Sequence, residues 1–509
     1  MDPAVPARRK GPSVLHRLTG AFRRPGKRAD PAEWEAFPLI EAAGEVVAGW
    51  GLEIRAGLAA DPAATGADAG APALRAPFEL DVQVIAEGFE APGGWRVRLR
   101  VDEASPYPAA VLPLVALPPD RPGPRGPQRS PGPQGAGAPQ AVRDPRLPPD
   151  AEAAAAAVRR IRAVYSVQGQ VTGFGTRAVA VLGSPGLLGR DPAPAPAPDP
   201  VAGTRIRQPR PGGFADVTAV IAHGDRPGRL WWSYLSPHFV TPDRAELCDL
   251  GTRASALGRD LLGRADRADA PSRLRAAAGE RLAREVPAGF LELLEAVAAR
   301  IAPRPPRILL LSEDPYVPWE LAALERPLDP SLPAFLDCQA VVGRWSLGGR
   351  RPGLPAPPVV RGEASALRDG LAALHGTLAA FGEPAELIGL TVPGGTGGLL
   401  RVDGSDPVPR LVAGHRLEGA PFVFLAGGAD PDLAPAFLVA GAGGAAAPLW
   451  PVGGEAAREL ALELHRRCLA GEPPAEALRS LRCAGSAAAL AYRFSGHPSA
   501  VLAPPQSTA

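Results

Sequence analysis

The sequence predicts a multidomain chain in which all-β modules come first and an α/β domain with a mainly parallel sheet comes last. Short runs that alternate apolar and polar residues dominate the N-terminal half, and such alternation is typical of strands with one buried face. The C-terminal part instead alternates continuous apolar runs with stretches of helical length, which indicates parallel strands covered on both faces. A length of 509 residues leaves room for about two to four domains.

The first strands lie between a basic N-terminal tail and a long segment rich in Pro and Gly. Residues 78–85 and 95–101 alternate in hydrophobicity, and a Gly-containing turn separates them. Residues 45–54 and 109–117 have a similar strand-like composition. Together these runs predict a small β-sandwich of immunoglobulin-like type.

Beyond the Pro/Gly-rich segment the signals change from one stretch to the next. Residues 151–162 are rich in Ala and predict a helix, and residues 163–182 return to strand character. Residues 274–301 predict a helical segment, because their apolar positions recur at spacings near 3.6 residues.

A second β segment carries a pair of adjacent tryptophans. Residues 215–222 and 228–235 are strand-like, and the second run contains Trp231 and Trp232. Such a pair could form a platform for a carbohydrate or a peptide. The more common arrangement places one ring in the core and one on the sheet face, and we favour it.

The α/β domain is defined by its order of apolar runs. Ligand and catalytic groups in such sheets lie at the carboxyl ends of the strands. We therefore expect residues 387–392 and 422–426 to be adjacent parallel strands whose ends meet. Predicted strands begin at Ile308, Ala340, Leu387, Phe422 and Ala445, and predicted helices cover residues 364–381, 433–440, 455–469 and 474–481.

These signals also give the domain boundaries. The predicted order is a disordered basic tail (1–33), a sandwich-like domain (34–117), a disordered Pro/Gly linker (118–150), a helix plus a β segment (151–187), a Pro/Ala linker (188–213), a second β segment (214–256), a helical connector (257–302), the α/β domain (303–502) and a tail (503–509).

Composition excludes several classes of function. The net charge of +2 gives no bulk electrostatic case for binding nucleic acid. The four cysteines are scattered without a CxxC pair, so we expect reduced thiols and no zinc site. Residues 392–398 are rich in Gly but lack the Gly-Lys-Ser/Thr of a phosphate-binding loop, and we expect no cofactor. No apolar run is long enough for a membrane span, and we expect a cytoplasmic protein.

Residues 303–502 carry a series of short motifs, which occupy residues 312–320, 341–345, 434–441 with 447–452, 471–479 and 491–498. The first motif is an acidic turn followed by Val-Pro-Trp-Glu. In this order the motifs resemble those of the CHAT family, the caspase-like α/β peptidase domains of bacterial signalling proteins.

The departures from the family pattern concern its chemistry. By this resemblance the catalytic cysteine falls at Gly428 or Gly427, and the catalytic histidine falls at Pro393 or Gly394. A cysteine nucleophile needs an adjacent imidazole, and neither glycine nor proline supplies a nucleophile or a base. The resemblance therefore implies a caspase-like domain without its catalytic pair.

The resemblance also implies roles for other residues. We expect the cleft to be lined by Ser312, Glu313, Asp314, Thr391 and Asp430. The structural part of the motifs consists of Pro318, Trp319, Glu320, Trp450 and Pro451, and we expect Trp319 to be largely buried.

Three hypotheses about function follow. The first is a non-catalytic CHAT-like protein that regulates or scaffolds a bacterial signalling or defence system, with protein partners such as NTPase, sensor or peptidase modules encoded nearby. The second is an active cysteine peptidase with a displaced Cys/His pair. The third is a receptor that binds a ligand or peptide in the former active-site cleft. The sequence predicts no membrane span and leaves the oligomeric state open.

Overall fold

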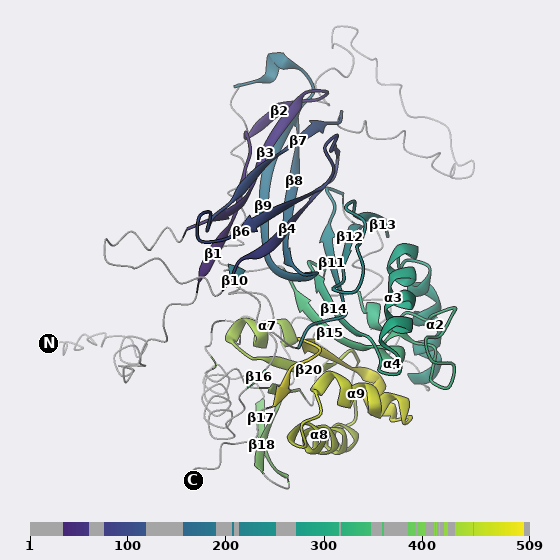
Figure 1. Ribbon diagram of the computed structural model, residues 1–509. Helices are drawn as coiled ribbons and strands as arrows, with labels where there is room; N and C mark the ends of the chain where they lie inside the picture. Colours follow the sequence, from purple (N-terminus) through teal and green to yellow (C-terminus); the bar gives the residue numbers. More distant parts are fainter. Residues whose placement is uncertain are drawn as a thin grey trace, which may run out of the picture.

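Figure 1 shows the computed structural model of the chain, with an N-terminal β-rich region above a C-terminal α/β region. The structure describes residues 34–60, 76–118, 156–189, 206–207, 213–226, 228–250, 271–314, 317–347, 359–360, 385–392, 395–402, 412, 414, 417, 422–425, 433–450 and 452–502. The predicted N-terminal tail, the predicted helix at residues 364–381 and nearly all of the predicted Pro/Gly linker lie outside these residues.

The N-terminal β region (residues 34–118, 156–189 and 206–207, where described) consists of two five-stranded sheets that enclose one core. The first sheet has the order β10 (Ile206–Arg207), β1 (Glu35–Glu41), β3 (Gly51–Ala59), β7 (Ala109–Ala116) and β5 (Phe89–Glu90). The second has the order β2 (Glu45–Val47), β9 (Gln170–Leu182), β8 (Ala156–Val167), β4 (Phe78–Ala86) and β6 (Arg96–Val101).

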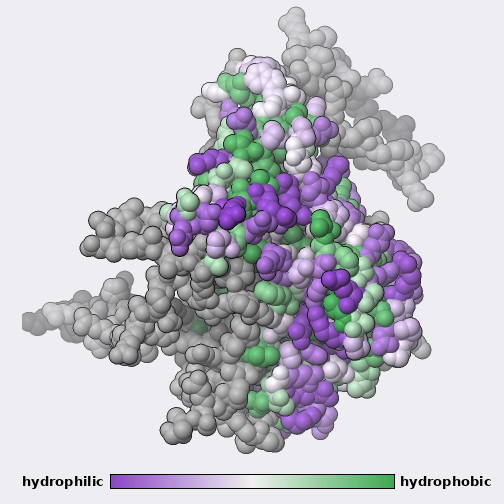
Figure 2. Space-filling model, viewed as in Figure 1, coloured by the Kyte–Doolittle hydropathy of each residue, from purple (hydrophilic) through white to green (hydrophobic). Residues whose placement is uncertain are grey.

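Alternation along the strands explains this core. In β3, Leu52 and Ile54 are buried while Glu53 and Arg55 are exposed, because successive side chains of a strand point to opposite faces. Tyr165 of the second sheet donates a hydrogen bond to the Leu39 carbonyl of the first over 2.6 Å. Hydrophilic residues gather on the outer side of this region, over β6 and its neighbour β4 (Figure 2).

Two expectations for this region are wrong. The described part of the predicted helix at residues 151–162 is the start of β8, which pairs with β4 and β9 along both edges. Pairing on both sides outweighs the weak helical preference of its alanines. The predicted strand at residues 45–54 is two strands, because a turn with Gly49 at φ +83° separates β2 from β3.

The C-terminal region is built on one mixed sheet of eight strands. Its order is β13 (Glu246–Asp249), β12 (Arg229–Leu235), β11 (Val217–His223), β14 (Arg307–Ser312), β15 (Val341–Ser346), β21 (Tyr492–Gly496), β20 (Gly444–Pro448) and β19 (Phe422–Phe424). The strands from β11 to β21 are parallel to one another, and β12, β13 and β20 each run antiparallel to a neighbour.

The strands within residues 214–256 do not form a separate β segment. β11 pairs in parallel with β14, with Val217 opposite Ile308, and is buried over nearly its whole length. A strand that is apolar on both faces needs cover on both sides, which an independent small unit cannot provide. The other boundaries predicted from the sequence stay predictions.

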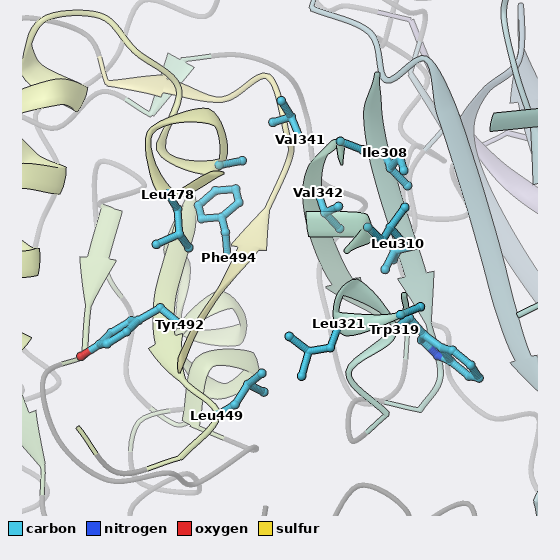
Figure 3. Packing of buried hydrophobic residues seen from close by; sticks show 14 of the residues in the cluster. Ile308, Leu310, Trp319, Leu321, Val341, Val342, Leu449, Leu478, Tyr492 and Phe494 are labelled. Atoms are coloured by element: carbon cyan, nitrogen blue, oxygen red, sulfur yellow. The ribbon is translucent and has the colours of Figure 1, made fainter. Parts of the chain in front are cut away.

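Helices cover one face of this sheet. They are α2 (Pro271–Ala283), α3 (Ala288–Ile301), α8 (Gly454–Leu469), α9 (Pro474–Cys483) and α10 (Ala487–Ala491), and their apolar residues share one core with the sheet. Figure 3 shows part of this core, with Leu478 and Phe494 on one side and Val342 and Leu310 on the other. The described part of the predicted helical connector thus forms part of this layer.

The opposite face is covered in two different ways. Helix α7 (Leu433–Ala440) lies over the end of the sheet that contains β20. Over β11 and β14 the cover is instead the second sheet of the N-terminal β region, whose Ile85, Val164 and Phe174 pack with Val220 and Leu309 (Figure 1). The expected helical layer is therefore partly replaced by β-structure.

The expected pairing of residues 387–392 with 422–426 is wrong. β17 (Ala385–Val392) pairs antiparallel with β18 (Gly395–Val402) in a sheet of two strands, while β19 is the edge of the eight-stranded sheet. A connection of two residues between β17 and β18 suits an antiparallel hairpin, whereas a parallel pair needs a long crossover. A further two-stranded sheet joins β16 (Val359–Val360) to β22 (Val501–Leu502).

Candidate functional site

The acidic turn after β14 is closed by its own hydrogen bonds. The Ser312 hydroxyl donates to the Asp314 carbonyl over 2.7 Å and accepts from the Asp314 amide over 3.1 Å. The Asp314 carboxylate accepts from the Val317 amide over 3.3 Å. Ser312 and Asp314 are both buried, so these expected cleft residues hold the turn in shape.

Glu313, the third residue of the acidic turn, binds the N-terminal β region. Its two carboxylate oxygens accept from Nε and one Nη of Arg162, each over 2.9 Å, and one of them also accepts from the His223 amide over 2.6 Å. The side chain of Arg162, in β8, is only 3% exposed and that of Glu313 is 16% exposed. Such a bidentate pair is short and directional, so Glu313 is committed to joining the two regions.

The Val-Pro-Trp-Glu part of the motif packs as expected. Trp319 is 0% exposed, which confirms the predicted burial, and its ring meets that of Trp232 edge-on with centroids 4.9 Å apart. Glu320 is buried, and its Oε2 lies 3.4 Å from an Nη of Arg344 in β15. The Arg344 guanidinium also donates a hydrogen bond to the Val317 carbonyl. Trp450 belongs to the same core, Pro318 is buried, and Pro451 lies outside the described residues.

The carboxyl ends of the parallel strands meet at a very small cavity. Ser312 of β14, Ser346 of β15 and Ser495 of β21 line it together with Arg344 and Arg493. Its volume of about 10 Å³ suits at most a single water molecule and excludes a peptide side chain.

The other expected site positions cannot be placed in this cavity. Thr391 lies in β17, outside the eight-stranded sheet. Asp430 and the four positions that replace the catalytic pair (Pro393, Gly394, Gly427 and Gly428) lie outside the described residues.

All four cysteines are described, and burial governs the pKa of two of them. Burial raises the pKa of Cys248 and of Cys468 to about 12. Cys338 and Cys483 share a hydrogen bond, which raises the pKa of Cys338 and lowers that of Cys483. The Arg275 guanidinium also donates to the Cys338 sulfur over 3.3 Å.

Three described histidines, His238, His465 and His497, have side-chain partners other than these thiols. His465 lies on the same helix as Cys468, but its Nδ1 bonds to the Ala461 carbonyl over 2.7 Å and burial lowers its pKa. His497 accepts from the Ser499 amide over 3.1 Å, and burial lowers its pKa to about 4. His238 bonds to the Asp216 carboxylate over 2.8 Å. The structure therefore shows no cysteine bonded to a described histidine, and it shows no metal-binding cluster of His, Cys, Asp and Glu within the described ranges.

A polar seam extends the contact between the two regions beyond Glu313. Gln83 of β4 accepts from the Ser233 hydroxyl over 2.7 Å and donates to the Asp243 carbonyl over 2.6 Å. Arg96 donates to the Pro242 carbonyl over 2.9 Å, and Gln170 donates to the Ala215 carbonyl over 2.7 Å. These side chains fix the N-terminal β region against the sheet.

Comparison with protein families now places part of this architecture. Residues 425–485 match the CHAT domain family. The match runs from the residue after β19 through α7, β20 and α8 to the residues after α9, and so includes two of the motif segments identified in the sequence. No curated protein matches the chain. Among the described helices, none has the length and apolar character needed to cross a membrane.

Sequence reasoning missed Arg162 and the polar seam. Arg159, Arg160 and Arg162 are charged residues inside a mostly apolar strand, and this interruption is the signal that could have drawn attention to them. Their partners are distant in sequence, with 151 positions between Arg162 and Glu313, so no local pattern indicated the pairing.

Proposed function

We propose that this chain is a non-catalytic CHAT-like protein that regulates or scaffolds a bacterial signalling or defence system. The observation that carries this proposal is that none of the four cysteines bonds to the imidazole of a described histidine. A thiol with a raised pKa is a poor nucleophile, and three of the four thiols have one. The sequence adds Gly and Pro where the family resemblance puts the cysteine and the histidine.

The fold supports a caspase-like interpretation of the C-terminal region. Its central strands β11, β14, β15 and β21 are parallel, helices cover one face, and the CHAT family matches residues 425–485. We interpret the N-terminal β region as an immunoglobulin-like module that has become part of the same structural unit. Its binding to the acidic turn favours a regulatory or scaffolding role, since this turn would border the cleft of an active relative.

The acidic turn supports the same conclusion. In a peptidase of this family the turn would face substrate, whereas here Glu313 bonds to Arg162 and Ser312 and Asp314 bond to each other. A substrate would have to displace a buried bidentate ion pair to reach these side chains, at a cost of about 3 kcal/mol or more.

A cleavage assay tests the proposal. The full chain is incubated with peptide libraries that carry basic or acidic residues at the cleavage position, beside a matched variant in which all four cysteines are Ala. We expect no cleavage product from either protein. Cleavage by the wild type that disappears when a single cysteine is replaced would overturn the proposal and establish a displaced catalytic pair.

A further inference from the structure

A cavity of about 250 Å³ opens between the N-terminal β region and the edge of the eight-stranded sheet formed by β12 and β13. We propose that it binds a small organic anion with a planar ring, which stacks on Trp95 and Trp231 while its acidic group contacts Arg159 and Arg244. The cavity lies at the opposite edge of the sheet from β19, so its function does not depend on the proposed loss of peptidase activity.

Two half-buried tryptophans from different regions give the cavity aromatic walls. Trp95 precedes β6 in the N-terminal β region, and Trp231 lies in β12 of the C-terminal sheet. The indole N–H of Trp231 donates to the Glu87 carboxylate over 3.2 Å, which fixes the orientation of this ring. Trp232 points instead into the core, so the pair divides between core and sheet face as favoured from the sequence. Exposed indole faces stack well on flat rings.

Glu87 lines the cavity, and neighbouring groups balance the negative charge of its carboxylate. Burial opposes the ionisation of Glu87, but hydrogen bonds from the Asp225 amide, Arg229 and Trp231 together hold its pKa below the usual value. Arg229 donates to Glu87 over 2.5 Å and to Asp249 over 3.1 Å. Glu87 therefore stays ionised and pairs with Arg229, while Arg159 lies 3.5 Å from Asp225 and Arg244 is the lining guanidinium without an ion pair among the described residues.

Arg159 is the buried cation of this site. Its side chain is 9% exposed, its Nη1 lies 3.5 Å from the Asp225 carboxylate, and its Nε has no hydrogen-bond partner among the described residues. Gly88, at φ +74°, makes room for this guanidinium, because a Cβ there would lie 1.6 Å from Nη1. This guanidinium lines the cavity and its contact with Asp225 is long, so it keeps donor capacity for a ligand oxygen.

Arg244 supplies the second cation at the rim. It is exposed and forms no ion pair with any residue in the described part of the chain. Two guanidinium-bearing side chains in the lining of one cavity favour a carboxylate or a phosphate over a neutral ligand. The volume lies just below the usual range of about 300–1,000 Å³ for small-molecule pockets, which suits a single ring system with one acidic group.

Calorimetric titration of the full chain tests this site with four probes: adenosine 5′-monophosphate, indole-3-acetate, adenosine and inorganic phosphate. We expect at least one of the two ring-bearing anions to bind with a Kd below about 1 mM, roughly tenfold tighter than adenosine or phosphate. Preference for the monophosphate identifies a phosphate-bearing ligand, and preference for indole-3-acetate identifies a carboxylate. Binding of neither anion more tightly than adenosine and phosphate would overturn the proposal.

Variants assign the binding to this cavity. Gly88→Ala displaces the Arg159 guanidinium, and Arg244→Gln removes the rim cation without disturbing any described ion pair; each is expected to weaken binding about tenfold. Arg100→Gln is the matched control, because Arg100 is exposed and, within the described part of the chain, pairs only with Asp102. Should Gly88→Ala fail to fold, Arg244→Gln alone decides, and unchanged affinity in that variant contradicts the proposed site.

Discussion

Two arginines of the same strand meet their acidic partners in different ways. Arg162 forms two hydrogen bonds of 2.9 Å with Glu313, and its side chain is only 3% exposed. Arg159, three residues earlier in the same strand, has one ion-pair contact among the described residues, 3.5 Å from Asp225, and lines a cavity of about 250 Å³. The first ion pair holds the two regions together. The second leaves hydrogen-bond donors of the Arg159 guanidinium beside the cavity without a close acceptor. The contact between the two regions therefore contains a structural ion pair and, beside it, the cavity that we propose as a binding site.

The same comparison explains why the acidic turn is a poor place to look for a ligand. Its carboxylates are used by the fold, and the adjoining cavity of about 10 Å³ has no room for an organic molecule. The opposite edge of the sheet, which the family motifs do not mark, has the larger cavity and the weaker ion pair.

The largest expected effect comes from the core that carries the acidic turn. Trp319→Ala removes a fully buried ring that packs on Trp232, and cavity formation should lower the free energy of unfolding by about 3–5 kcal/mol. Urea unfolding measures this change. A variant as stable as the wild type would show that the turn does not depend on this packing.

The next largest effect is expected when the buried ion pair between Arg162 and Glu313 is broken. Glu313→Ala leaves the Arg162 guanidinium buried without its partner, and should lower the free energy of unfolding by about 3 kcal/mol. Arg98→Gln is the matched control, because the Arg98 side chain is 62% exposed and surface pairs contribute less than about 1 kcal/mol. Equal losses of unfolding free energy in the two variants would show that the buried Arg162–Glu313 pair contributes no more than a surface pair.

The smallest expected effect is a gain in stability, and it concerns the ion pair between Arg159 and Asp225. Burial, followed by the charge of Glu87, raises the pKa of Asp225 to about 6. The folded state thus binds a proton more readily than the unfolded state, and stability gained from this group increases as pH falls from about 7 toward 4. Asp225→Asn should therefore raise the melting temperature at pH 7.5 and lose this advantage near pH 4.5. A lower melting temperature of Asp225→Asn at pH 7.5 would mean instead that the Arg159–Asp225 ion pair stabilises the contact between the two regions.

Much of the fold could be predicted from local patterns. The alternation at residues 78–85 and 95–101 corresponds to β4 and β6, and the helices at residues 455–469 and 474–481 correspond to α8 and α9. The burial of Trp319 followed from its motif. In each case the signal lies within a few residues of the element that it predicts.

Two local features were missed, the turn at Gly49 and the antiparallel pairing of β17 with β18, and the other errors come from non-local pairing. β8 begins in an Ala-rich stretch and is a strand because β4 and β9 lie on either side of it. β21 comes from the closing motif of the domain, which gave no separate strand signal, yet it enters the sheet between β15 and β20. The contact of Arg162 with Glu313 likewise depends on how two sheets pack, which no short window of sequence records.

The central claim is that the acidic turn binds the N-terminal β region in place of a substrate. Hydrogen–deuterium exchange of the full chain tests it most directly, with Glu313→Gln compared against the control Arg98→Gln. We predict that Glu313→Gln speeds amide exchange both in the turn at residues 312–314 and in β8, which contains Arg162. Arg162 is 151 positions from Glu313 in the sequence, and the control should leave exchange in both segments unchanged. Exchange in β8 that does not respond to Glu313→Gln would contradict the account.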